Sequence, residues 1–372
     1  MEQICERSKC TGCSTCMNVC PKNCITMKEN QYGISMPSID KDNCINCNIC
    51  VKKCPENNQI EFNVPLKVYA GWSIDREERK KSASGGIAWE MYKYIINHGG
   101  IAVGTQYDKN MNLVHKMTDK IEEAKKYRGS KYVQSYIGKV YTQIKNQLKK
   151  NKKVIFIGTP CQVNGLRSFL RNEDNSHLIT VDLVCHGVPP IKYLKDYLKY
   201  LKIQKKINNI TFRGENNWHF TGYKNEEIIY KKHNKEDLYY KAFLDGLFYR
   251  ENCYQCRYAR KERVADITIG DFWGIGKEIP FNHEIEDGVS LILINTKKGN
   301  KLIQEIKPQI FLEERTIEEA QKGNAQLNQP SHLNSNTQLF RELYEKYGFE
   351  VAIERTLKGE IKWEQEYYPC KE

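Results

Sequence analysis

Cysteine spacing is the clearest chemical signal in this sequence of 372 residues. Two runs of four cysteines share one pattern, with gaps of two, two and three residues and a proline after the last cysteine. Such gaps place three thiolates around one face of an iron-sulfur cubane, while the fourth cysteine reaches the other cluster. The pattern therefore predicts two 4Fe-4S clusters, one on Cys10, Cys13, Cys16 and Cys54 and one on Cys44, Cys47, Cys50 and Cys20.

Structural zinc is the alternative for these two runs. Zinc takes four ligands in paired couples and has no use for four evenly spaced cysteines with a trailing proline. Residues 5–62 also resemble the two-4Fe-4S ferredoxin family. We expect Cys5 and Cys24 to pack around the core of this unit and Cys370 to be an exposed thiol of the tail.

Four more cysteines follow later in the chain. Cys161 comes soon after the apolar strand predicted at 154–158, and Cys185 ends a similar strand predicted at 178–184. Two such strand ends place both thiols on one rim of a sheet. With the pair Cys253 and Cys256 they could hold a third 4Fe-4S cluster, while a zinc site or unligated thiols remain the alternatives.

Six further segments resemble the coenzyme F420 hydrogenase/dehydrogenase beta-subunit family. They are SASGG (82–86), GSKYVQS (129–135), GTPCQVNGL (158–166), DLVCHGVPP (182–190), FRGENNW (212–218) and CYQCRYARKERVADITIGDFWG (253–274). The resemblance runs from about residue 66 to 320 and implies a flavin, usually FAD, beside a third 4Fe-4S cluster on Cys161, Cys185, Cys253 and Cys256. It places the flavin near Ser84, Gly85, Gly86, Lys131, Tyr132, Gln134, Ser135, Thr159, Pro160 and Gln162.

Elementary chemistry agrees in outline with this flavin site. Gly85 and Gly86 before a helix would expose backbone N–H groups to a phosphate, although an ordinary helix N-cap is the alternative. Lys131 could neutralise a pyrophosphate. No G-x-G-x-x-G follows a strand, so the nicotinamide-binding fingerprint is absent.

Other residues have weaker functional interpretations. His186 is a candidate proton donor, or a loop histidine that satisfies the backbone. Asp271 could hold the flavin or position arginines, or simply form a turn. We expect Trp218, His219 and Phe220 to pack rather than to stack on a ligand.

These residues require elements to position them. The length exceeds what one core usually organises, so we expect two or three domains. The predicted fold is an α+β ferredoxin-like domain (1–62), a linker (63–80), a larger mixed α/β flavin-binding domain in two parts (81–150 and 151–322) and a peripheral helical C-terminal extension (323–372).

Within that frame, alternating patterns predict individual elements. Helices are expected at 87–97, 119–127, 138–150, 160–170, 335–347 and 350–357, and strands at 101–107, 112–117, 154–158, 178–184, 209–213, 227–231, 266–270 and 289–295.

Composition limits the partners and the location. The formal net charge of +12 could attract acidic molecules, but no nucleic-acid motif accompanies it, so an acidic ferredoxin or cofactor fits better. No apolar stretch reaches membrane-spanning length and the N-terminus lacks a signal-peptide pattern, which predicts a cytoplasmic protein. Fifteen cysteines in a reducing compartment indicate metal ligation.

The predicted function is that of an enzyme whose flavin exchanges hydride with an organic substrate while clusters exchange single electrons with a ferredoxin or another carrier. Coenzyme F420 is the substrate that the resemblance suggests. The Lys-, Asn- and Ile-rich composition is typical of an AT-rich anaerobic bacterium, and such organisms often lack that coenzyme, which favours another metabolite or a sugar intermediate. FRGENNW also departs from the family motif. A non-catalytic electron-transfer subunit of a larger complex, or a zinc protein, would be the alternatives.

Overall fold

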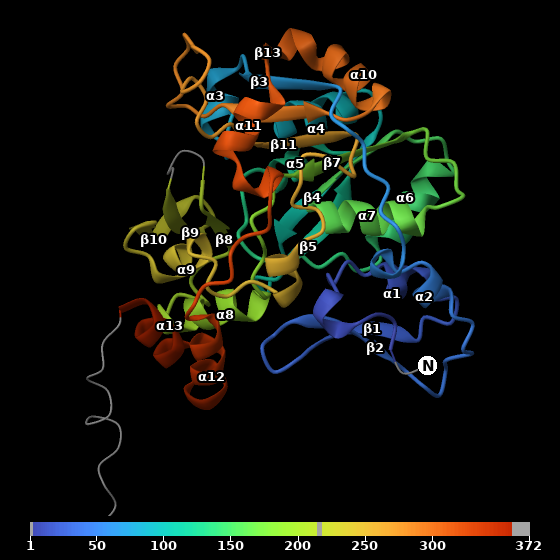
Figure 1. The fold of residues 1–372 in the computed structure, drawn as a ribbon, viewed down its shortest axis with the longest axis vertical. Helices are drawn as coiled ribbons and strands as arrows, with labels where there is room; N and C mark the ends of the chain where they lie inside the picture. The colour runs from blue at the N-terminus through green and yellow to red at the C-terminus, as the bar shows by residue number, and fades with distance from the viewer. Residues whose placement is uncertain (1–2, 214–217, 359–372) are drawn as a thin grey trace, which may run out of the picture.

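The computed structural model describes residues 3–213 and 218–358. Its first part, residues 3–62, contains a small antiparallel sheet in which β1 (Ile25–Glu29) pairs with β2 (Ser35–Ile39). Two short helices, α1 (Thr15–Val19) and α2 (Ile49–Lys52), contact each other. In Figure 1 this part lies at one end of the molecule.

The two cysteine runs give the same local backbone. Ser14 and Asn48 each lie between the second and third cysteine of their run, directly before α1 and α2. Both have left-handed backbone conformations, with φ of 62° and 60°. The duplicated sequence pattern is therefore duplicated in the fold.

A mixed sheet of eight strands forms the centre of the rest of the chain (Figure 1). The strands are β3 (Lys67–Ser73), β4 (Ile101–Tyr107), β5 (Leu113–Thr118), β6 (Val154–Gly158), β7 (Leu178–Leu183), β11 (Ile267–Asp271), β12 (Ser290–Ile294) and β13 (Ile310–Arg315). Their order is β13-β3-β12-β11-β7-β6-β4-β5. The inner strands β11, β7, β6 and β4 are parallel, and antiparallel strands extend both sides.

Helices cover both faces of this sheet. They are α4 (Ile87–Asn97) and α10 (Lys297–Ile306) on one face, and α6 (Val140–Leu148) and α7 (Pro160–Phe169) on the other. Strand β6 shows why two layers form, because successive side chains of a strand point to opposite faces. Ile155 packs with α4 and α10, whereas Val154 and Phe156 pack with α6 and α7.

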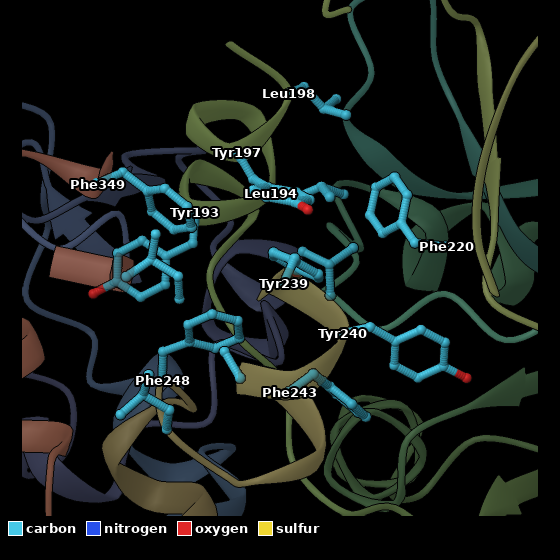
Figure 2. Close-up of a cluster of buried hydrophobic side chains, with 14 of the residues drawn as sticks. Tyr193, Leu194, Tyr197, Leu198, Phe220, Tyr239, Tyr240, Phe243, Phe248 and Phe349 are labelled. Atoms are coloured by element: carbon cyan, nitrogen blue, oxygen red, sulfur yellow. The ribbon is translucent and has the colours of Figure 1, made fainter. Parts of the chain in front are cut away.

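An aromatic cluster organises the remaining part of the molecule (Figure 2). Its elements are β8 (Asn209–Thr211), β9 (His219–Lys224), β10 (Glu227–His233), α8 (Ile191–Tyr200), α9 (Leu238–Leu244), α12 (Thr337–Tyr347) and α13 (Phe349–Lys358). The three strands form a separate sheet in the order β10-β9-β8. The Tyr197 and Phe220 rings meet edge to face at 5.5 Å, a favourable geometry for aromatic pairs.

Short elements complete the described chain. They are α3 (Arg76–Lys80), α5 (Ile121–Ala124), α11 (Ile317–Gly323) and the 3-10 turns Arg7–Lys9, Pro55–Asn57, Lys125–Tyr127, Glu251–Gln255, Lys307–Gln309 and Ala325–Leu327. Among the described residues, no helix has the length and apolar character needed to cross a bilayer.

Two expectations about the architecture need correction. Residues 63–80, expected to be a linker, contain α3 and also β3, which pairs with β12 and β13 inside the large sheet. The expected C-terminal extension is helical but not peripheral, because Phe340 and Phe349 are buried in the aromatic cluster. Cys370 lies outside the described residues, as do residues 214–217 of FRGENNW.

Candidate functional site

Eight cysteines of residues 3–62 surround two small cavities, four in each. Group one consists of Cys10, Cys13, Cys16 and Cys54, and group two consists of Cys20, Cys44, Cys47 and Cys50. These are the two sets that the spacing predicts, with the last cysteine of each run joining the other set. A fifth thiol lines each cavity, Cys5 in group one and Cys24 in group two.

Group three consists of Cys161, Cys185, Cys253 and Cys256, which line one cavity at the edge of the large sheet. Strands β6 and β7 are parallel neighbours, so the segments that follow them bring Cys161 and Cys185 to the same rim, as expected. Thr159 and Gln162 form a capping box that begins α7 and fixes the turn that carries Cys161.

Burial opposes ionisation of several of these thiols, whereas a hydrogen bond with Cys5 lowers the pKa of Cys10 to about 6. Burial raises the pKa of both Cys13 and Cys253 to about 11, and burial together with the three other thiols of group three raises the pKa of Cys161. Four thiolates can share such a cavity only with compensating cations. Among the described residues, no His, Cys, Asp and Glu side chains form a group suited to a single metal ion. A cationic iron-sulfur cluster fits this all-thiol donor set.

A second cavity of about 280 Å³ adjoins group three. We call it the central cavity. It lies between the start of α4, the segment 128–135 and the ends of β6, β7 and β11. Its volume is near the lower limit of about 300 Å³ for small-molecule sites, so it could enclose part of a dinucleotide.

Most residues that the resemblance assigns to a flavin line this cavity. Ser84, Gly86, Lys131, Tyr132, Ser135, Thr159 and Gln162 do so, and so does Asp271, which was a candidate because it follows a strand. Gly85 instead faces the sheet, where its N–H donates to Ser290 Oγ at 3.0 Å. Pro160 lines the group three cavity. Gln134 points toward residues 3–62 and donates to the Thr11 carbonyl at 3.1 Å.

Unpartnered polar atoms in the walls indicate that the central cavity is built for a ligand. Ser84 Oγ, Trp89 Nε1 and Arg128 Nε are buried, and within the described part of the chain they have no hydrogen-bond partner. Buried polar atoms are normally satisfied, so three orphans in one cavity indicate an absent polar partner. A flavin, with its ring carbonyls and phosphates, fits these donors.

Positive charge in the walls favours an anionic ligand. Arg128 and Lys131 both line the cavity. Arg128 is paired with the carboxylate of Glu78, and the carboxylate of Asp271 is paired with Arg213 at 3.0 and 3.2 Å, so Lys131 is the cation that these ion pairs leave without a counter-charge. Within residues 3–213 and 218–358, Lys131 Nζ donates only to the carbonyls of Arg128 and Gly129, at 2.6 and 3.3 Å. Burial lowers the pKa of Lys131 to about 7. A diphosphate would supply the counter-charge that this lysine lacks.

The central cavity and the group three cavity share a wall. Thr159 and the segment 185–188 line both. His186 belongs to this segment, and its side chain is exposed. A ligand in the central cavity would therefore lie next to a cluster held by group three.

Group one is also close to group three. Thr15 Oγ1 lies 3.3 Å from Cys13 Sγ and donates to the Gly165 carbonyl of α7 at 2.9 Å. The first turn of the same helix carries Cys161. Burial raises the pKa of Tyr141, and the nearby thiols of Cys13 and Cys161 raise it further. Tyr141 therefore lies close to both group one and group three.

Some residues of the site were missed by the sequence reasoning. Arg128 directly precedes GSKYVQS, so a basic residue beside a phosphate-associated motif was a usable signal. Trp89 lies in the first turn of α4, and nothing in the sequence beyond its proximity to SASGG indicated that it lines the cavity. Arg213 is 5% exposed and lies 4.2 Å from the Trp218 ring centre, a pairing that depends on tertiary structure. Phe220 is fully buried in the aromatic cluster, so it packs as expected.

Comparisons with known proteins agree with the geometry. Residues 151–320 match the family described as the C terminus of the coenzyme F420 hydrogenase/dehydrogenase beta subunit, and residues 9–58 match the 4Fe-4S dicluster domain. The coenzyme F420-dependent sulfite reductase of Methanocaldococcus jannaschii is 25% identical over 331 residues, which cover 84% of this chain and 49% of that protein. This chain therefore spans about half the length of the curated relative.

A solved structure is also similar. It is the F420-reducing NiFe hydrogenase complex from Methanosarcina barkeri, with 20% identity, a TM-score of 0.49, and coverage of 81% of this chain and 95% of that chain.

Proposed function

We propose that the chain is an iron-sulfur flavoprotein oxidoreductase, because residues 151–320 match the coenzyme F420 hydrogenase/dehydrogenase beta-subunit family and residues 9–58 match the 4Fe-4S dicluster domain. The observation that carries the proposal is the wall that the central cavity shares with group three. A flavin would supply two-electron hydride exchange and three 4Fe-4S clusters would supply one-electron steps.

The proposed relay follows the arrangement of the cysteine groups. Group three adjoins the central cavity, group one adjoins α7, and group two lies farther out, where Cys47 is exposed. The order central cavity, group three, group one, group two therefore connects a buried site to the surface. The chain's own contribution is to fix these spacings and to exclude water from the inner groups.

Residues of the central cavity would bind and orient the flavin. Arg128 and Lys131 would hold its phosphates, together with the N–H groups that begin α4. Ser84 Oγ and Trp89 Nε1 would donate to polar atoms of the ligand. The exposed imidazole of His186 lies at the shared wall, where it would carry a proton to or from the substrate. FAD is the flavin that we propose, because a diphosphate uses both cations.

An acidic one-electron carrier, such as a ferredoxin, is the proposed partner at group two. Ile45 and Ile49 are 57% and 38% exposed on either side of the exposed Cys47. The lysines Lys22, Lys41 and Lys52 of the same part of the chain are also exposed. An exposed apolar contact on a chain with a formal net charge of +12 suits a negatively charged protein.

The organic substrate is proposed from the relatives' names. Coenzyme F420 occurs in the family description and in the name of the curated relative, so it is the first substrate to test. The division into the domains 1–62, 81–150 and 151–322 also remains a proposal, with β3 now assigned to the large sheet.

An electron-transfer subunit without its own substrate is the second candidate. The observation that favours it is that the chain spans about half the length of the curated relative. The missing half could be supplied by a separate protein. Co-purification of a stable partner, with no turnover by the isolated chain, would support this candidate over the first.

Anaerobic quantitation tests the cofactor content directly. We expect about twelve irons, as many sulfides and one flavin per chain, since each of three cubanes holds about four irons. Cys185→Ser should reduce iron to about eight, while the matched control Cys24→Ser, which alters a fifth thiol, should leave it near twelve. A colourless preparation without labile sulfide would contradict the proposal. Reduction of the bound flavin by reduced F420 or by ferredoxin then distinguishes the substrates.

A further inference from the structure

Arg250 connects two of the cysteine groups through its backbone and its side chain. Its carbonyl accepts a hydrogen bond of 2.9 Å from the N–H of Cys253 in group three. Its guanidinium Nη2 donates a hydrogen bond of 2.8 Å to the carbonyl of Cys10 in group one. A single residue thus contacts the backbone of one predicted ligand in each group.

The rest of the guanidinium is held equally firmly. Nη1 donates to Gln134 Oε1 at 2.8 Å and to the Ser35 carbonyl at 3.1 Å, and Nε donates to Asn252 Oδ1 at 3.2 Å. Gln134 in turn donates to the carbonyl of Thr11, the neighbour of Cys10. Arg250 is 1% exposed, and all of these partners are neutral oxygen atoms. A full positive charge is therefore buried beside group one without neutralisation by these contacts.

Two physical consequences follow for a cluster held by group one. A buried positive charge stabilises the extra negative charge of the reduced cluster, which raises its reduction potential. The planar guanidinium also holds the Cys10 loop and the β2 backbone at fixed positions relative to the Cys253 loop. The ammonium group of a lysine could not make the same set of hydrogen bonds.

We propose that Arg250 is a positioning residue that holds group one against group three and raises the reduction potential of the group one cluster. This inference rests on the proposed function, because it requires clusters in both groups. The proposal gives the buried guanidinium of Arg250 two roles, one in joining residues 3–62 to the rest of the chain and one in setting a reduction potential. The charge would favour residence of the electron on the cluster next to group three.

The test is a potentiometric titration of the anaerobically purified holoenzyme, monitored by electron paramagnetic resonance. Arg250→Gln keeps a hydrogen-bond donor and removes the charge, and Arg250→Lys keeps the charge and removes the planar guanidinium. Arg171→Met is the matched control, since Arg171 is an exposed arginine at the same boundary that donates to Asn58 Oδ1 at 3.2 Å. A Cys47→Ser sample, which alters group two, assigns the signals.

Arg250→Gln should lower the reduced-to-oxidised ratio of the group one cluster at least tenfold at a given potential. This change corresponds to a fall of about 59 mV in the reduction potential of a one-electron couple. The group two cluster and the Arg171→Met control should not shift. Arg250→Lys should keep the potential within threefold while weakening the magnetic coupling between the reduced clusters of groups one and three.

Three results would overturn the inference. The first is an unchanged group one potential in Arg250→Gln, and the second is an equal shift of all three clusters. The third result applies if Arg250→Gln does not retain iron: it is an Arg250→Lys spectrum in which the magnetic coupling between the clusters of groups one and three is unaltered. A wild-type protein without three cluster signals would instead refute the proposed function, so the two failures can be told apart.

Discussion

The hydroxyl of Thr15 donates a 2.9 Å hydrogen bond to the carbonyl of Gly165, joining α1 of the cysteine-rich N-terminal part to α7 of the large sheet. Close approach at this point requires glycine. A Cβ on residue 165 would lie 2.9 Å from Cys13 Cβ and 2.9 Å from Thr15 Oγ1. The two parts therefore meet where group one is nearest to the helix that carries Cys161.

Gly165→Ala should separate these helices. We expect a loss of about 1–3 kcal/mol in the free energy of unfolding, which is typical of overpacking, and slower electron exchange between groups one and three. Anaerobic denaturation and flash-reduction kinetics would measure the two effects. Gly222→Ala is the control, because its nearest neighbour would be Ile207 Cγ2 at 3.3 Å, a less severe approach than 2.9 Å. Equal behaviour of the two variants would contradict the prediction.

Flavin affinity should depend on the charge of Lys131. Burial lowers the pKa of Lys131 to about 7, and a bound diphosphate would raise it again, so binding takes up a proton. The affinity of flavin-free protein for FAD should therefore fall as the pH rises from about 7 to about 9. Titration calorimetry would show this slope in the wild type and in Lys126→Met, an exposed control that pairs with Glu123, but not in Lys131→Met. A slope that persists in Lys131→Met would refute the assignment.

A negative charge at Ile45 should repel an acidic carrier from group two. Ile45→Glu should reduce the rate of reduction by ferredoxin about tenfold at low ionic strength, with a smaller effect at high salt. Ile74→Glu changes an isoleucine that is 64% exposed but lies after β3, outside this surface, and it should have no effect. Stopped-flow kinetics would measure both variants, and indistinguishable rates would exclude Ile45 from the contact surface.

Stability should fall on acidification because of His115. This histidine is 3% exposed and stacks on Phe156 with ring centres 5.2 Å apart, and burial lowers its pKa from 6.5 to about 4. Between these values the unfolded chain binds a proton that the folded chain does not, so stability decreases as the pH falls below 6.5. The full difference is about 3 kcal/mol, and part of it is reached by about pH 5.5.

His115→Phe should remove this part of the pH dependence. Denaturation midpoints at pH 7.5, 6.5 and 5.5 would check it, a range chosen to spare acid-labile clusters. The exposed His177 provides the control substitution His177→Phe, which should keep the wild-type slope. If His115→Phe also keeps that slope, another group is responsible for it.

Local patterns predicted the parts of the fold that depend on local physics. The helix Ile87–Asn97 and the strands Ile101–Tyr107 and Val154–Gly158 have the bounds expected from their apolar periodicity. β3 was missed because Pro65 and its distance from other strands suggested a connector, whereas its partners β12 and β13 lie more than two hundred residues away in sequence. Pairing over such separations leaves no local signal.

The candidate site divides in the same way. Cysteine spacing predicted which thiols gather in each group, because short loops fix their positions. Motif resemblance placed Lys131 and Thr159 at the central cavity, but it also assigned Gln134, which turns away to contact Thr11 and Arg250. The direction of a side chain depends on the tertiary contacts on either side of its backbone, which a motif does not encode. Arg250 carries no motif, so only the fold indicates its role.

The segment from Cys185 to Val188 borders two chambers at once, so the proposed cofactors should load in sequence. Iron and sulfide bound to Cys185 would fix one side of the neighbouring chamber. Oxygen damage to that metal centre should therefore release the yellow cofactor as well, and reconstitution should succeed only when iron and sulfide are added before FAD.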